Sequence, residues 1–349
     1  MKALTVVPLQ AGTAALSDMP EPPESDGPVL VETLAVGVCG TDIEIVSGEY
    51  GWAPPGEERL VIGHESLGRV LEAPAGAPMA EGDLVVGIVR RPDPVPCPSC
   101  NVLEWDFCRN GQYTERGIKE LHGYCSERYR ITPDFAVKVD PDLGLLGVLL
   151  EPTSVVAKAW EQVDLVGGRL HWEPETVLVT GAGPIGLLAA LIGVQRGLQV
   201  HVLDQVTEGV KPDLVRSLGA SYHTGKLADA CPDPDIVIEC TGVADVVLDA
   251  MTSVGAAGVV CLTGVSSGGH LVEVDEGQLN RSMVLDNVAV VGSVNANRRH
   301  YELAADALAA GERSWLERLV TRRVPLDSWP DALQRQPDDV KVVIEVNPE

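Results

Sequence analysis

Hydrophobic and polar residues follow two different patterns along this chain, and the change comes near residue 152. Before it, short apolar runs are separated by glycine and proline. Residues 29–36 alternate partly between apolar and polar positions, as a half-buried strand does, and residues 60–62 and 83–88 are further strand candidates. Residues 1–152 therefore predict an irregular β domain.

After residue 152, strand and helix patterns alternate. Apolar residues recur at helical spacing over residues 153–163 and again over 187–196. Short apolar runs typical of strands cover 177–179, 200–203, 236–238, 259–262 and 288–291. This alternation predicts an α/β domain with a parallel, doubly wound sheet over residues 153–295. We expect residues 296–349, with a helix at 301–310 and a last strand at 341–346, to return to the first domain.

Length, composition and charge narrow the classes of function. The chain has 349 residues, of which 45% are hydrophobic, enough for two domains of ordinary size. Its net charge of −25 repels phosphate backbones and argues against a nucleic-acid partner. We find no apolar run long enough to span a bilayer and read residues 1–7 as a strand with no signal peptide before it. We therefore expect a soluble cytoplasmic protein without a membrane partner.

A glycine motif after one of the predicted strands carries the first candidate chemistry. Residues 181–186 read Gly-Ala-Gly-Pro-Ile-Gly, follow an apolar strand and open an apolar helix. Gly181 permits the tight turn, Gly183 lets the backbone approach a pyrophosphate, and Gly186 lets the helix pack close to the strand. The helix N-terminus, with Pro184 and Ile185, then faces the phosphates. The motif predicts a dinucleotide site; the alternative is a glycine-rich turn in another doubly wound protein.

The end of the next strand indicates which dinucleotide binds. Asp204 lies 18 residues after Gly186, where a carboxylate accepts hydrogen bonds from the adenosine ribose and repels a 2′-phosphate. No arginine follows it at once. The sequence therefore predicts that NAD is preferred and NADP is possible, with Lys211 placed to soften the preference.

A second candidate site combines a thiol, an imidazole and carboxylates. Cys39 lies in a turn after a predicted strand, and His64 follows another apolar run. Catalytic zinc usually has three protein ligands and one open position. Cys39 and His64 supply two, and Glu65 or Glu151 is the third, with Asp42 as the expected partner of the other His64 nitrogen. The alternative is an ordinary core thiol and an unrelated turn histidine.

Together these motifs resemble the zinc-dependent medium-chain alcohol dehydrogenases over nearly the whole length. The markers are residues 39–42, residues 63–65, the cysteine cluster at 97–108 and residues 181–186. The glucose (aldose) dehydrogenase branch is the most similar, on residues 89–92, 114–118, 151–152 and 291–295. The resemblance implies a GroES-like β fold for the first domain and a Rossmann fold for the second.

The resemblance also implies roles for individual residues. The implied ligands of the catalytic zinc are Cys39, His64, Glu65 and Glu151. Thr41 would contact the substrate hydroxyl and relay its proton. The residues expected at the substrate are Thr41, Glu115, Glu151 and Asn295. The residues expected at the cofactor, besides the glycine motif and Asp204, are Thr241 and Asn295.

Two features depart from the family pattern. The family's structural zinc lobe usually has four cysteines, whereas this chain has Cys97, Cys100 and Cys108. Asp93 is placed to be the fourth ligand, because zinc accepts carboxylate oxygen; the alternative is a lobe without metal. Val89 stands where some sugar-binding relatives carry a polar residue.

The resulting functional prediction is a zinc-dependent oxidoreductase. It transfers a hydride from the C1 hydroxyl of an aldose, with D-glucose as the leading substrate and a lactone as the product, to NAD(P)⁺. One alternative is a dehydrogenase of another polyol, a cyclitol or an amino sugar alcohol. Another is an NAD(P)-binding protein without catalysis. By resemblance, we expect a homodimer or homotetramer.

Overall fold

The computed structural model describes residues 1–266 and 271–348, and the chain divides into two compact units. The first unit comprises Met1–Ser154, Asn295–Ala309 and Leu319–Glu349, and the second comprises Val155–Val294 and Ala310–Arg318. The sequence predicted domain boundaries after residues 152 and 295, and the two units divide after residues 154 and 294. The short segment 310–318 lies with the second unit, whereas the prediction returned all of 296–349 to the first.

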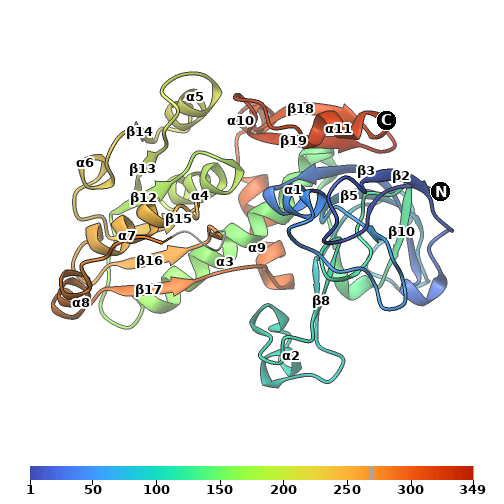
Figure 1. Ribbon diagram of the computed structural model, residues 1–349, viewed down its shortest axis with the longest axis horizontal. Coiled ribbons are helices and arrows are strands. Elements are labelled where there is room, and N and C mark those ends of the chain that lie inside the picture. The colour runs from blue at the N-terminus through green and yellow to red at the C-terminus, as the bar shows by residue number, and fades with distance from the viewer. Residues whose placement is uncertain (267–270, 349) are drawn as a thin grey trace. The chain divides into compact units, whose positions relative to one another are not determined.

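The first unit is built from short, mainly antiparallel strands (Figure 1). Its sheets have the orders β2-β1-β4, β11-β6-β5-β3-β19-β18 with β10 also paired to β3, and β7-β8-β9. The strands are β1 Lys2–Val6, β2 Ala15–Asp18, β3 Val29–Val38, β4 Leu60–Val61, β5 Glu65–Glu72, β6 Leu84–Gly87, β7 Arg90–Arg91, β8 Thr114–Arg116, β9 Glu120–Leu121, β10 Arg128–Ile131, β11 Ala136–Lys138, β18 Val320–Pro325 and β19 Lys341–Glu345. The predicted irregular β domain is confirmed. Strand β19 pairs with β3, so the last strand of the chain lies beside the strand that leads to Cys39.

Few helices belong to the first unit. They are α1 Gly40–Ser47, α2 Pro98–Asn101, α9 Arg298–Ala309 and α11 Trp329–Leu333. Helix α1 ends at Gly48, whose φ of 81° is the left-handed conformation that favours glycine. Helix α2 lies in a lobe that follows β7, drawn in turquoise at the lower edge of Figure 1. The apolar core of this unit includes Leu4, Val31, Ile62 and Tyr124.

The second unit contains a parallel sheet of six strands. Its order is β14-β13-β12-β15-β16-β17, which Figure 1 shows from top to bottom. In chain order this is 3-2-1-4-5-6, the doubly wound arrangement of dinucleotide-binding domains. The strands are β12 Thr176–Thr180, β13 Gln199–Leu203, β14 Ser221–His223, β15 Ile236–Glu239, β16 Val259–Leu262 and β17 Ala289–Gly292. The predicted parallel α/β fold is confirmed, although β14 was not foreseen because only three of its residues pair.

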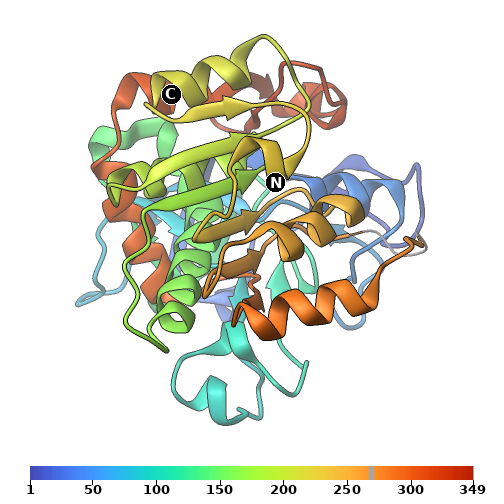
Figure 2. The same ribbon diagram turned by 90° about the vertical axis from the view of Figure 1, so that its left-hand side faces the viewer.

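The strands of this sheet are joined by α4 Pro184–Gln195, α5 Val210–Ser217, α6 Leu227–Ala230, α7 Ala244–Ser253 and α8 Glu276–Leu285. Two further helices, α3 Leu150–Gly167 and α10 Arg313–Leu319, come before and after the sheet along the chain. Figure 2 shows the yellow α5 beside one edge of the sheet and the orange α8 near the other. The carboxyl ends of β12, β13 and β15 adjoin at one edge, which is where a ligand binds in such sheets.

We expected no apolar stretch long enough to span a bilayer, but one helical stretch meets that test. It is Pro141–Gly167, which consists of a 3₁₀ segment and α3 and is long and apolar enough to cross a membrane by length and composition. Of its most apolar 18-residue window, 83% is buried inside the protein, as in the core helix of a globular fold. The sequence prediction counted only uninterrupted apolar runs, and the charged residues Glu151 and Lys158 interrupt this one.

Candidate active site

Cys39 is held at the start of α1. It is the N-cap residue, with an extended backbone, and its sulfur accepts a hydrogen bond from Thr41 N at 3.3 Å. In return Asp42 Oδ2 accepts a hydrogen bond from Cys39 N at 2.9 Å, which completes a capping box. The cap therefore fixes the direction of the thiol.

His64 lies between β4 and β5, and its two ring nitrogens face Cys39 and Asp42. Its Nε2 is 3.1 Å from Cys39 Sγ, and its Nδ1 is 3.4 Å from Asp42 Oδ1. Burial lowers the pKa of His64, but the charges of Cys39 and Asp42 outweigh burial and raise this pKa well above its usual value. Asp42 thus faces the second ring nitrogen, as expected, although Oδ1 and Nδ1 make no hydrogen bond with each other.

Glu65 starts β5 and is bound by a lysine that sequence reasoning missed. Lys341 Nζ donates to Glu65 Oε1 at 2.7 Å and to Oε2 at 2.6 Å, and it also donates to Val38 O at 3.2 Å. The Lys341 side chain is 1% exposed and that of Glu65 is 3% exposed. Burial lowers the pKa of Lys341, whereas Glu65 and Cys39 more than compensate and raise it. Lys341 thus holds the buried Glu65 carboxylate in place beside the Cys39 thiol.

Glu151 lies in the first turn of α3 and is buried. Burial raises its pKa to about 7; the neighbouring Glu65 and Asp42 add to the rise, while His64 and Lys341 oppose it. These influences place Glu151 beside the cluster. Its carboxylate is nevertheless outside the group of ligand atoms that lie within 4.8 Å of one another, which contains only Cys39, His64 and Glu65.

The three clustered donors fit a zinc ion. Tetrahedral zinc with bonds of about 2.3 Å to sulfur and about 2.0 Å to nitrogen separates those two ligand atoms by about 3.5 Å. The 3.1 Å between Cys39 Sγ and His64 Nε2 is within a few tenths of an ångström of that spacing. Sulfur, imidazole and carboxylate together are a donor set that zinc accepts.

The residues expected at the sugar lie in the same unit. Glu115, on β8, is 6% exposed, and its Oε1 accepts a hydrogen bond from Asn295 Nδ2 at 2.8 Å. Asn295 has a φ of 60°, a left-handed conformation that asparagine tolerates better than most residues, and its Oδ1 accepts from Ala296 N. The structure therefore brings together two predicted substrate residues that are 180 positions apart. Val89, the noted departure from sugar-binding relatives, is 2% exposed.

In the second unit, the glycine motif forms the turn that it predicts. Gly181 has a φ of 86°, and a Cβ on Gly186 would lie 1.8 Å from Gly181 O. A Cβ on Gly183 would meet nothing within 4 Å, so open space lies before this turn. Pro184 and Ile185 begin α4, whose first N–H groups face that space. The site fits a pyrophosphate.

The carboxylate predicted to bind ribose is tied to the glycine turn. Asp204 Oδ2 accepts from Ala182 N at 2.6 Å, and Oδ1 accepts from Val206 N at 3.0 Å. Lys211 Nζ is 3.9 Å from Oδ2. Each carboxylate oxygen has a second lone pair, so these bonds leave acceptor capacity for ribose hydroxyls.

Thr241, the other predicted cofactor residue, is organised by Glu239. This carboxylate, fully buried at the end of β15, accepts hydrogen bonds from Thr241 N and Oγ1, from Gly242 N and from Thr180 Oγ1. Glu239 thus fixes the loop after β15 next to the loop after β12. Sequence reasoning missed it, although an acidic residue closing an apolar strand was a visible signal.

The three cysteines of the lobe also meet. The sulfurs of Cys97, Cys100 and Cys108 lie within 4.8 Å of one another, and the first two are 3.7 Å apart, close to the roughly 3.8 Å between two thiolates on zinc. Backbone N–H groups, that of Arg109 foremost, lower the pKa of Cys97 to about 6, while burial raises that of Cys100 to about 11. All eight cysteines, which lie in the described part of the chain, are free of disulfides.

Asp93 was predicted to be the fourth ligand, but its carboxylate does not lie in the group formed by these thiols. Its Oδ1 accepts a hydrogen bond from Val95 N at 2.7 Å, and its carboxylate lies outside the cluster. The backbone N–H of Asp93 donates to Cys100 instead. Its Oδ2 is buried and has no hydrogen-bond partner.

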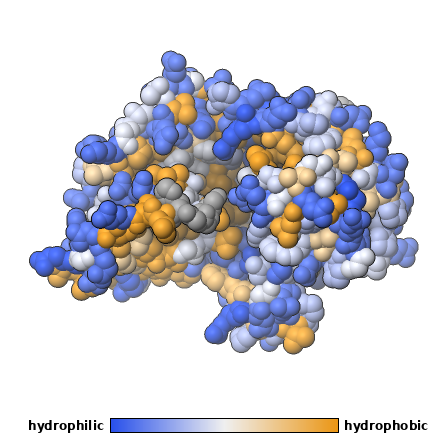
Figure 3. Space-filling model, in the orientation of Figure 1, coloured by the Kyte–Doolittle hydropathy of each residue, from blue (hydrophilic) through white to orange (hydrophobic). Residues whose placement is uncertain are grey.

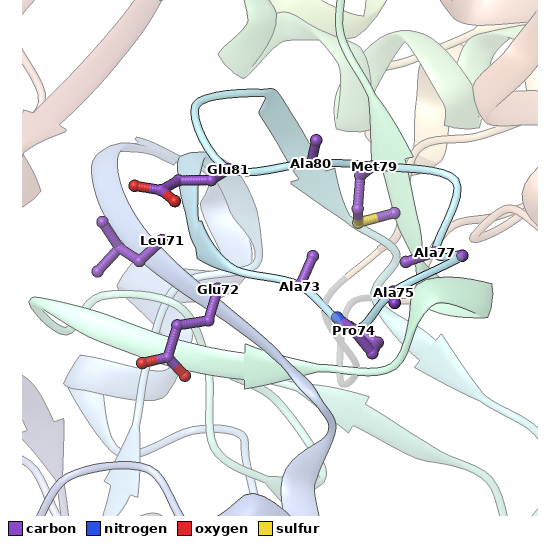
Figure 4. Close-up of a pocket in the computed structure, with 10 residues that line it drawn as sticks. Leu71, Glu72, Ala73, Pro74, Ala75, Ala77, Met79, Ala80 and Glu81 are labelled. Carbon is purple, nitrogen blue, oxygen red and sulfur yellow. The ribbon is translucent and has the colours of Figure 1, made fainter.

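A surface hollow of about 480 Å³ lies in the loop between β5 and β6 (Figure 4). Alanines and Met79 line it, with Glu72 and Glu81 at its margin. It contains none of the predicted site residues. Its lining offers neither a metal-binding cluster nor convergent polar groups, so we assign it no catalytic part.

Known proteins resemble this chain both in sequence and in structure. Residues 25–141 match the alcohol dehydrogenase GroES-like domain, and residues 144–346 match the glucose dehydrogenase C-terminus. The chain is 39% identical to the glucose 1-dehydrogenase of Methanocella arvoryzae over 99% of both chains, and 40% identical to glucose 1-dehydrogenase 1 of Caldivirga maquilingensis over 100% of this chain and 99% of that one.

A solved structure is similar throughout. The Haloferax mediterranei glucose dehydrogenase in complex with NADP, zinc and gluconolactone superimposes with a TM-score of 0.92 at 32% identity and covers 100% of both chains. The fold, the Cys39 and His64 cluster, the glycine turn and these full-length matches agree. The chain belongs to the zinc-type medium-chain alcohol dehydrogenases, in their glucose dehydrogenase branch.

Proposed function

We propose that this protein oxidises an aldose at C1, with D-glucose as the leading substrate, and passes the hydride to a nicotinamide dinucleotide. The observation that carries the proposal is the buried cluster of Cys39, His64 and Glu65, in a chain whose full-length relatives are named glucose 1-dehydrogenases. The Haloferax relative is described with zinc, NADP and gluconolactone, which is the lactone that such a reaction would give.

The residues around the cluster suit this chemistry. Zinc, when bound, lowers the pKa of a coordinated hydroxyl, and the nicotinamide accepts the hydride. Cys39, His64 and Glu65, with Glu151 as an exchangeable fourth donor, hold the metal. Asp42 orients His64 through its second ring nitrogen.

Thr41 is placed to move the substrate proton. Its backbone N–H donates to Cys39 Sγ, which holds the first turn of α1 beside the thiol. The Thr41 hydroxyl takes the proton of the C1 hydroxyl and passes it to water. Glu115 and Asn295 bind other hydroxyls of the sugar and so choose which hydroxyl faces the metal.

For the cofactor, we propose a preference for NAD over NADP. The residues that would hold it are the glycine turn, Asp204 and Thr241, with Asn295 toward the nicotinamide end. Asp204 repels a 2′-phosphate, whereas Lys211, 3.9 Å away, moderates that repulsion. Two relatives of known structure are described with NADP, so the carboxylate at residue 204 is what argues for NAD here.

The lobe and the assembly complete the proposal. We propose a second zinc on Cys97, Cys100 and Cys108, with Asp93 as the fourth ligand after a side-chain rotation.

We also propose a homodimer or homotetramer formed through β17, one of the two edge strands of the six-stranded sheet. Val284 and Leu285 of α8 are 63% and 62% exposed, and Figure 3 shows apolar surface in that region. Cytoplasmic location stays a prediction.

The test is a turnover assay on the purified protein. NAD or NADP reduction is followed with D-glucose, other aldoses, cyclitols and polyols, with and without a zinc chelator. Chelator-sensitive oxidation of an aldose, faster with NAD, is the expected result. Oxidation only of a cyclitol or polyol would replace the substrate, and equal efficiency with both cofactors would remove the NAD preference. NAD binding without any turnover would favour the non-catalytic alternative.

A further inference from the structure

Glu115 receives all its hydrogen bonds on one carboxylate oxygen. Arg90 Nε, at 3.0 Å, and Asn295 Nδ2, at 2.8 Å, both donate to Glu115 Oε1, and Arg90 Nη2 is 2.9 Å from the same atom. Among the residues that the structure describes, none donates to Oε2. A carboxylate so held presents its second oxygen in one fixed direction, as recognition of a sugar hydroxyl requires.

Arg90 itself is fixed from three sides. It lies directly opposite Glu115 in the antiparallel pair of β7 and β8. Its Nη1 donates to Asp106 O at 3.1 Å, and its guanidinium carbon lies 3.8 Å from the centre of the Tyr113 ring. Arg90 is 6% exposed, so its rigid fork is held in place by packing as well as by hydrogen bonds.

The Asp106 side chain binds a neighbour of Asn295, which is the other partner of Glu115. Asp106 lies in the lobe between Cys100 and Cys108, and its Oδ1 accepts from Asn297 Nδ2 at 2.9 Å. Asn297 N in turn donates to His300 Nδ1 at 3.0 Å. These bonds anchor Asn297, which lies directly before α9 and two residues after Asn295. The lobe is therefore linked to Glu115 through Arg90 and to Asn295 through the neighbouring Asn297.

We propose that Arg90 and Asp106 are positioning residues through which the cysteine lobe sets the orientation of Glu115 and Asn295 toward the sugar. This inference rests on the proposed function, because it assumes that Glu115 binds the substrate. Neither Arg90 nor Asp106 contacts the sugar. Loss of the Arg90 fork frees the Glu115 carboxylate to rotate and leaves the metal cluster and the glycine turn intact.

The experiment compares two neighbouring arginines on β7. Arg90→Met is expected to raise the KM for D-glucose by about 10- to 100-fold, with little change in kcat or in the Kd of NAD. Arg90→Lys, which reaches one acceptor at a time, is expected to lie between this variant and the wild type. Arg91→Met is the control. Arg91 donates to backbone carbonyls, foremost Ile88 O at 2.5 Å, and packs on Phe135. It should lose stability without a comparable rise in KM.

A double variant separates positioning from general damage. If Arg90 acts through Glu115, then adding Arg90→Met to Glu115→Ala should raise the glucose KM no further. Equal KM values for the Arg90 and Arg91 variants, or additive effects in the double variant, would overturn the inference. If Arg90→Met does not fold, the lysine variant decides. Wild-type protein is assayed first: no oxidation of any aldose would overturn the proposed function and this inference with it, whereas normal turnover with an Arg90-independent KM overturns only the inference.

Discussion

The two groups of metal-binding side chains in the first unit are built in opposite ways. Cys39, His64 and Glu65 offer three different donor atoms, whereas Cys97, Cys100 and Cys108 offer three thiols. The first group comes from two separate regions, the start of α1 and the start of β5. The second comes from a single lobe of twelve residues, 97–108.

The difference extends to what surrounds each group. Asp42 approaches His64, and Lys341 binds both oxygens of Glu65, so charged partners from elsewhere in the fold orient the mixed cluster. The thiols of the lobe are instead contacted mainly by nearby backbone N–H groups. A mixed cluster with a buried charged surround suits an exchangeable, catalytic position, and a compact thiol cluster suits a structural one.

Removing a ligand of the mixed cluster should have the largest effect. Cys39→Ala deletes the proposed sulfur ligand of the metal, so kcat should fall on the order of 10³-fold or more, while the NAD Kd stays close to wild type. Bound zinc, measured by mass spectrometry of the native protein, should drop by one per chain. Cys125→Ala is the control, because Cys125 is a buried thiol outside both clusters. Substantial turnover by Cys39→Ala would contradict its role.

Removing Lys341, which binds Glu65, should have the next largest effect, this time on the free energy of unfolding. Lys341→Met leaves the Glu65 carboxylate buried without its cation, which typically costs about 3–5 kcal/mol of unfolding free energy. Lys138→Met is the matched control, since Lys138 pairs with Asp83 on the surface and its loss should cost under about 1 kcal/mol. Urea unfolding measures both. Equal losses would show that the Lys341 pair is not the special one.

Asp42 tests whether the charged surround tunes the metal. Asp42→Asn keeps the size of the side chain but removes the charge beside His64 Nδ1, so zinc affinity or kcat/KM should fall by about 10- to 100-fold. Asp83→Asn serves as a control, because this carboxylate caps a turn through Ala80 N. A competition assay with a zinc chelator gives the affinity. Wild-type affinity and activity in Asp42→Asn would contradict the role of Asp42.

The lobe should give the smallest effect on chemistry. Cys100→Ser should remove one zinc per chain and lower Tm by several degrees, while kcat at saturating glucose changes by less than about tenfold. A wild-type protein with two zinc ions per chain, and one in this variant, would support the structural site. One zinc in both proteins would leave the lobe without metal and remove the contrast between the two clusters.

Local sequence patterns predicted the elements that form the dinucleotide site and the cysteine lobe. The apolar run before residue 180 and the glycines after it predicted β12, the turn and α4, because the strand period and the conformational needs of glycine act over a few residues. The cysteines of the lobe were equally visible, since 97–108 is short enough for spacing alone to bring them together. The short β14 was missed because only three of its residues pair, and the role of Glu239 was missed because it depends in part on Thr180, which lies on another strand.

The sequence by itself determined the donor types, the glycine turn and the family. Only the tertiary structure decided which carboxylates are engaged and by what. Lys341 reaches Glu65 across 276 residues because β19 pairs with β3, and Glu115 meets Asn295 across 180 because the chain returns to the first unit. Asp93 shows that spacing does not set direction: its spacing suits a zinc ligand, whereas in the structure its Oδ1 accepts from Val95 N and its carboxylate lies outside the thiol cluster. Spacing along the chain gives candidates, and the direction of a buried side chain depends on charges and packing contributed by distant segments.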